Sequence, residues 1–127
     1  VRDQILDSLL ELDFAALSHD DQLGYVRLLE IVFVRFGKPS PAKVSAIVGK
    51  LDPSFPADTF ELNWLLCETM AFLQAPSTAS KGMALIASAE SQEPQMEYAR
   101  SLRFLKAGWT PELREQQLEW FLKAANY

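Results

Sequence analysis

The chain has 127 residues, of which 49% are hydrophobic and 23% are charged, and its formal net charge is −5. This size and composition are typical of one globular domain with a core of its own. The acidic balance argues against nucleic acid and anionic membrane surfaces as partners, because both require a basic binding surface. No apolar run reaches the roughly 18–20 residues of a membrane span, so we expect no membrane insertion.

The chain begins at Val1 rather than at a methionine. We therefore expect residues 1–127 to be a single helical domain that belongs to a longer protein. Cys67 is the one cysteine, which excludes a disulfide within the chain.

Capping residues, prolines and glycines recur about every 16 to 22 residues and predict six or seven helices. The first helix is expected over residues 2–12. The second, over residues 19–36, begins after the cap residue Ser18 and ends at Gly37. Few polar residues interrupt its second half, so we expect it to be covered on several sides.

The third helix, over residues 41–51, begins with the cap residue Ser40 and a proline at its first position. The fourth is expected over residues 57–74, with Trp64 and Cys67 on its apolar face. The fifth spans residues 78–90 and is rich in small residues. The sixth is opened by Ser91 and Pro94, and runs to residue 107 with Gly108 as its C-cap. The seventh follows Thr110-Pro111 and continues to Asn126.

Taken in pairs, these helices repeat about every 33 to 40 residues, within the range of helical hairpin repeats. No segment has the alternating apolar pattern of a strand. The sequence therefore predicts an all-α fold, a HEAT-like repeat array wound as an α-α superhelix. The alternative is an irregular helical bundle, which contains the same helices without a fixed period.

Two stretches carry a family resemblance: ELNWLLCETMAFLQAP at residues 61–76 and QMEYARSLRFLKAGWTPELREQQLEWFLKAANY at residues 95–127. Residues 58–127 resemble HEAT-like repeat modules of large exported bacterial proteins of the planctomycete and acidobacterial type. The most specific piece is Gly-Trp-Thr-Pro-Glu-Leu-Arg at residues 108–114. In those proteins the module lies near propeller domains that resemble sugar dehydrogenases and near cytochrome c domains. The resemblance implies a non-catalytic spacer or docking module of an exported, redox-related protein, in the periplasm or outside the cell.

No residue pattern indicates catalysis or a cofactor. The lone histidine, His19, lies beside a helix cap with two aspartates, too few converging ligands for an ordinary metal site. Cys67 has no base nearby in the sequence and is interpreted as a buried apolar residue. We therefore expect no enzyme activity, no catalytic residue, no cofactor and no metal site.

A partner surface is the remaining candidate. Arg100, Arg103 and Lys106 follow at three-residue spacing, which predicts a basic stripe on the sixth helix beside Trp109. The seventh helix ends with apolar residues that include Phe121 and Leu122, and it does not resemble the polar cap of a finished array. The predicted partner surface therefore consists of six residues: Arg100, Arg103, Lys106, Trp109, Phe121 and Leu122. We expect it to contact another protein or a neighbouring domain of the same chain, or to mediate self-association.

A different class of function is a small-ligand-binding domain with an aromatic-lined pocket, framed by the three tryptophans. That alternative requires two aromatic side chains to face one cavity, whereas a scaffold buries them in its core.

Overall fold

The computed structural model describes residues 1–125, and these contain seven α-helices and no strand. The prediction of an all-α fold is confirmed. The helices are α1 (Arg2–Leu10), α2 (His19–Phe36), α3 (Pro41–Leu51), α4 (Phe60–Phe72), α5 (Thr78–Ser88), α6 (Gln92–Leu102) and α7 (Pro111–Ala124). Two short 3-10 turns follow α1 and α3, at Phe14–Ala16 and Asp52–Ser54.

Several helices begin where the sequence predicts, because their caps depend on local hydrogen bonds. Ser18, Ser40 and Thr110 each accept a hydrogen bond from the backbone N–H three residues further on, at 3.2, 3.4 and 3.2 Å. These bonds satisfy N–H groups that have no partner within the helix. Pro41 and Pro111 occupy the first helical positions, where the absence of an N–H costs nothing.

Helix ends are less well predicted. Gly37 does end α2: its φ of 77° is left-handed, and its N–H donates to the Phe33 carbonyl at 2.8 Å. Helices α1, α4 and α5 each stop about two residues before their predicted ends. The prediction for the sixth helix is wrong, since α6 ends at Leu102 and not at residue 107. The predicted end of the seventh helix, Asn126, lies outside the described residues.

The side chain of Gln74 provides the physical reason for the early end of α6. Its amide donates a hydrogen bond to the Phe104 carbonyl at 2.9 Å, and its oxygen accepts from the N–H groups of Lys106 and Ala107 at 2.7 and 3.2 Å. The connection from α6 to α7 is thereby held in an extended path against the turn between α4 and α5. We call this arrangement the Gln74 clamp.

Gly108 does not cap α6. It lies where the α6–α7 connection touches the turn between α4 and α5. Its φ is 79°, and a Cβ at this position would lie 2.2 Å from the Pro76 carbonyl oxygen. Only glycine permits both the left-handed backbone and this close approach.

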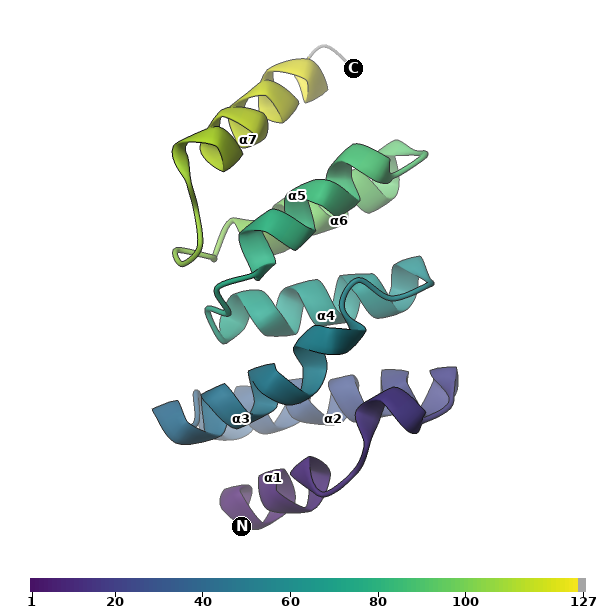
Figure 1. Ribbon diagram of the computed structural model, residues 1–127, viewed down its shortest axis with the longest axis vertical. Helices are drawn as coiled ribbons and strands as arrows, with labels where there is room; N and C mark the ends of the chain where they lie inside the picture. The colour runs from purple at the N-terminus through teal and green to yellow at the C-terminus, as the bar shows by residue number, and fades with distance from the viewer. Residues whose placement is uncertain (126–127) are drawn as a thin grey trace.

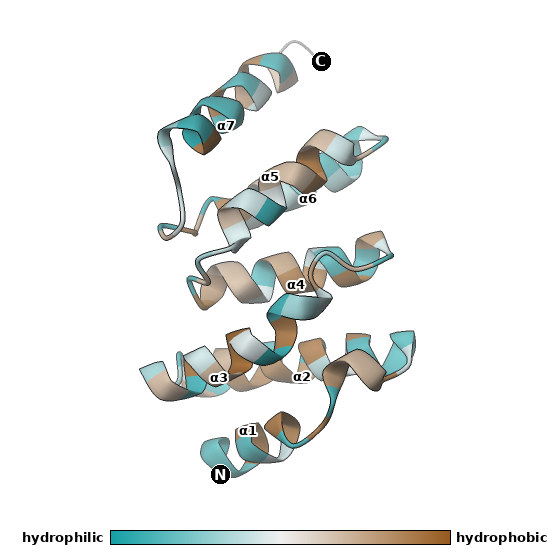
Figure 2. Ribbon diagram, in the orientation of Figure 1, coloured by the Kyte–Doolittle hydropathy of each residue, from teal (hydrophilic) through white to brown (hydrophobic). Residues whose placement is uncertain are grey.

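The helices are stacked along one long axis, with α1 and α7 at opposite ends (Figure 1). Helix α4 packs against α2 on one side and α6 on the other, while α5 packs against α6 and α7, and α1 against α2 and α3. One continuous core of buried apolar side chains runs between these helices. Hydrophobic residues are prominent on the central helices, whereas α7 is mostly hydrophilic in the same view (Figure 2) and buries no residue.

Candidate functional site

The predicted basic stripe does not form a continuous helical surface. Arg100 lies on α6 and pairs with Glu97 at 3.5 Å. Arg103 is the residue after the last helical position, and Lys106 lies in the connection held by the Gln74 clamp. The prediction of one stripe on the sixth helix is therefore wrong, because the helix ends before Lys106.

Trp109 packs in the elbow between α6 and α7. It is half-buried against the core, and its indole N–H donates to the Leu105 carbonyl at 3.0 Å. The Arg114 guanidinium lies 4.1 Å from the ring centroid, a cation–π contact. Both contacts stabilise the elbow and leave Trp109 half-covered.

Phe121 and Leu122 are exposed on α7, which packs mainly on α5. Trp120 anchors this helix: its indole N–H donates to the Gln95 side chain at 3.0 Å, and its ring lies edge-on to Phe121. The six predicted partner residues thus lie on α6, on the α6–α7 connection and on α7.

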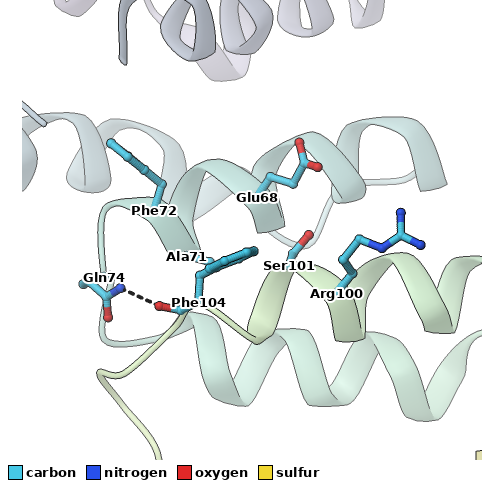
Figure 3. Close-up of a pocket in the computed structure, with 7 residues that line it drawn as sticks. All are labelled: Glu68, Ala71, Phe72, Gln74, Arg100, Ser101 and Phe104. Atoms are coloured by element: carbon cyan, nitrogen blue, oxygen red, sulfur yellow. Dashed lines mark hydrogen bonds between the residues drawn. The ribbon is translucent and has the colours of Figure 1, made fainter. Parts of the chain in front are cut away.

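A more coherent surface, which the sequence did not predict, lies on α2, α4 and α6. Two grooves run between neighbouring helices, one of about 380 Å³ between α4 and α6 and one of about 280 Å³ between α2 and α4. Glu68 and Phe72 of α4 line both grooves, so the two grooves adjoin along α4. The first groove is lined by Glu68, Ala71, Phe72, Gln74, Arg100, Ser101 and Phe104 (Figure 3), the second by Glu30, Phe33, Val34, Glu68, Thr69 and Phe72. We call these residues together the α2–α4–α6 face.

Large apolar side chains on this face are open to solvent. Val34 is 86% exposed, Phe104 70% and Phe72 41%. The Phe72 ring stacks on Phe33 of α2 at 5.1 Å and points away from Phe104, so that each groove has an aromatic wall (Figure 3). An ordered apolar surface of this kind is typical of a binding site.

The Gln74 clamp also determines the position of Phe104. Its bond to the Phe104 carbonyl fixes the backbone just beyond the last turn of α6 (Figure 3). If α6 continued as a helix, this carbonyl would be bonded within the helix instead. The clamp therefore holds an aromatic side chain at the edge of the first groove.

Two carboxyl groups face each other where the grooves meet. Burial and, to a smaller extent, the hydrogen bond and negative charge of Glu68 raise the pKa of Glu30 to about 7. The Thr69 hydroxyl, which donates to Glu30 at 3.4 Å, and the nearby Arg27 lower it by less. One proton is thus shared close to neutral pH in an otherwise apolar groove.

The residues weighed for chemistry lie apart from this face or are inert. Cys67 is fully buried, and burial, with a smaller contribution from Glu68, raises the pKa of its thiol to about 12, which keeps it protonated. The His19 ring bonds to the Thr59 hydroxyl at 2.8 Å. Within residues 1–125, no three His, Cys, Asp or Glu side chains are grouped so that they could hold a metal ion.

The tryptophans do not frame a pocket together. Trp64 is half-buried and stacks on Phe60 at 5.8 Å, and Trp120 lines a separate groove between α5 and α7. Trp64 and Trp120 both pack against the core while remaining partly exposed.

One signal in the sequence pointed to exposed apolar residues on α2, of which Val34 lies on this face. Residues 25–36 are apolar on nearly all sides, and we interpreted this as burial on several sides. In the structure Leu28, Ile31 and Val34 are exposed along α2. The helix lies at the surface, and its excess of apolar residues belongs to the exposed side.

A comparison of the chain with protein families, curated proteins and solved structures finds no match. None of the helices formed by residues 1–125 combines the length and the apolar character needed to cross a membrane.

Proposed function

We propose that this chain is a non-catalytic helical scaffold whose α2–α4–α6 face binds a segment of a partner protein. The observation that carries the proposal is that two adjoining grooves with exposed aromatic walls share Phe72. Arrays of stacked helices use such extended faces for binding. The resemblance of residues 58–127 to HEAT-like modules supports the same class of function, in an exported bacterial protein.

The shape of the surface favours a chain segment over a small molecule. A small ligand is typically buried over most of its area in a concave site. Here Phe104 and Val34 remain largely exposed at the two ends of the face. An amphipathic segment that crosses α4 would cover both, as a helix does when it packs into a groove.

A display library of peptides about 15 residues long, selected on the 127-residue chain, tests the proposal. Affinities would be measured by fluorescence anisotropy. We expect Phe72→Ser and Phe104→Ser to weaken binding by more than about tenfold, the loss typical of an aromatic hot spot. Phe36→Ser is the matched control, since Phe36 is 44% exposed and lines neither groove.

The outcomes are distinct. If no peptide binds, or if Phe36→Ser has the same effect as Phe104→Ser, the proposed function is wrong. The alternative function, a small-ligand site, is favoured by one observation: Phe72 and Phe104 line a single groove. Sensitivity to Val34→Ser separates the two, because Val34 lines only the second groove and a ligand confined to the first does not reach it.

A further inference from the structure

The junction of the two grooves holds two carboxyl groups, those of Glu30 and Glu68. Glu68 lines both grooves, and Glu30 lines the second. Among residues 1–125, no lysine, arginine or histidine nitrogen lies within 4.0 Å of either carboxylate. Both side chains are half-buried, so water compensates their charges only in part.

The charged groups around this pair do not neutralise it. Arg27 on α2 is close enough to lower the pKa of Glu30, but its effect is outweighed by burial and by Glu68. From α6, Arg100 lines the first groove and is paired with Glu97. On the side of α1, the groove against α2 is lined by Gln4, Ile5, Ser8, Leu9 and Leu28, none of which carries a charge.

We infer that the segment bound by the α2–α4–α6 face presents a lysine or arginine side chain to Glu30 and Glu68, between apolar side chains that enter the two grooves. This inference rests on the proposed function and specifies the chemistry of its partner. A cation at the junction would replace the shared proton and remove the repulsion between the carboxylates. Apolar side chains on either side would cover Phe104 and Val34.

This arrangement makes binding depend on pH. The cation requires the deprotonated pair, so that binding releases the proton held near neutral pH. The affinity is then expected to rise by up to about tenfold per pH unit below pH 7 and to level off above it. A bound segment without a cation would show no such rise.

The test uses peptides selected on the chain at pH 8. We expect most of them to contain a lysine or arginine flanked by apolar residues. Replacing that cation by norleucine, or replacing both carboxylates (Glu30→Gln with Glu68→Gln), should each weaken binding about tenfold, the coupling expected of a close interfacial charge pair. Glu61→Gln is the matched control, an exposed carboxylate on the same helix as Glu68 that lines neither groove.

The double-mutant cycle decides the outcome. If the norleucine peptide and the cationic peptide lose the same affinity when both carboxylates are replaced, the inference is wrong. It is also wrong if selected peptides lack a cation. In either case the proposed function still stands, provided that binding depends on Phe72 and Phe104. If the library yields no binder, both are wrong.

Discussion

Replacing Glu30 by glutamine is expected to change the pH dependence of folding in a defined direction. In the folded chain the pKa of Glu30 is raised from 4.5 to about 7, chiefly by burial and next by Glu68. The folded state therefore keeps a proton that the unfolded state releases between these two values. The contribution of Glu30 to stability consequently falls as the pH rises from about 4.5 to 7 and does not change further above pH 7.

The magnitude follows from the size of the shift. At about 1.4 kcal/mol per pH unit, the raised pKa of Glu30 corresponds to at most about 3 kcal/mol. Solvent screening of this half-buried group reduces the expected change to on the order of 1–2 kcal/mol. A glutamine amide donates a hydrogen bond to Glu68 at every pH, as only the protonated carboxyl of Glu30 does.

Urea unfolding at pH 5 and pH 8 measures the effect. We expect the Glu30→Gln variant and the wild type to have similar stabilities at pH 5, and the variant to be more stable by about 1–2 kcal/mol at pH 8. The difference between the two proteins cancels all other titrating groups. Glu61→Gln should show no such change. A Glu30→Gln effect of equal size at both pH values would refute the reasoning, because the carboxyl pair would then share no proton.

Four other predictions follow from particular contacts. In denaturant unfolding, Gly108→Ala should destabilise the fold by at least about 3 kcal/mol and Gly37→Ala by only about 1 kcal/mol. Both glycines have a positive φ, but a Cβ would meet a backbone oxygen only at Gly108. Thr78→Val should stabilise by about 1 kcal/mol in the same assay, since the hydroxyl of this buried residue finds no hydrogen-bond partner among residues 1–125. Trp64→Ala should cost about 2–3 kcal/mol, less than a fully buried aromatic would, and an unchanged unfolding midpoint would show that the ring packs on nothing. Light scattering over a concentration series should detect self-association through the exposed apolar residues of α7, and Phe121→Glu should abolish it. A monomer at all concentrations would contradict this prediction.

The helix starts could be predicted from sequence because their causes are local. A serine or threonine cap and the N–H that it accepts lie three residues apart, as at Ser18 and Thr110. The end of α6 has a distant cause, since Gln74 lies about thirty residues before the segment that it holds. Gly108 resembles a helix cap in the sequence, and only the position of Pro76 in space explains its role.

The candidate site escaped prediction for a related reason. Glu30 and Glu68 are ordinary helix-surface acids in the sequence, and they meet only because α2 packs against α4. The apolar stripe of α2 was visible, but an all-round apolar helix is equally typical of burial. Which of its sides faces solvent depends on the helices around it, and therefore on the tertiary structure.

Several features of the α2–α4–α6 face are unfavourable for an isolated protein. Gln74 adopts a left-handed backbone with φ of 59°, Phe104 exposes 70% of its area, and Glu30 lies against Glu68 with no cationic nitrogen of residues 1–125 within 4.0 Å. Each costs stability, on the order of 1 kcal/mol for a strained or unpaired group. All three line one or other of the two adjoining grooves, and proteins typically break local rules of stability where they bind. A bound segment with apolar side chains and one cation would compensate the exposed ring and the carboxyl pair together, while the Gln74 clamp holds Phe104 in place before the segment arrives.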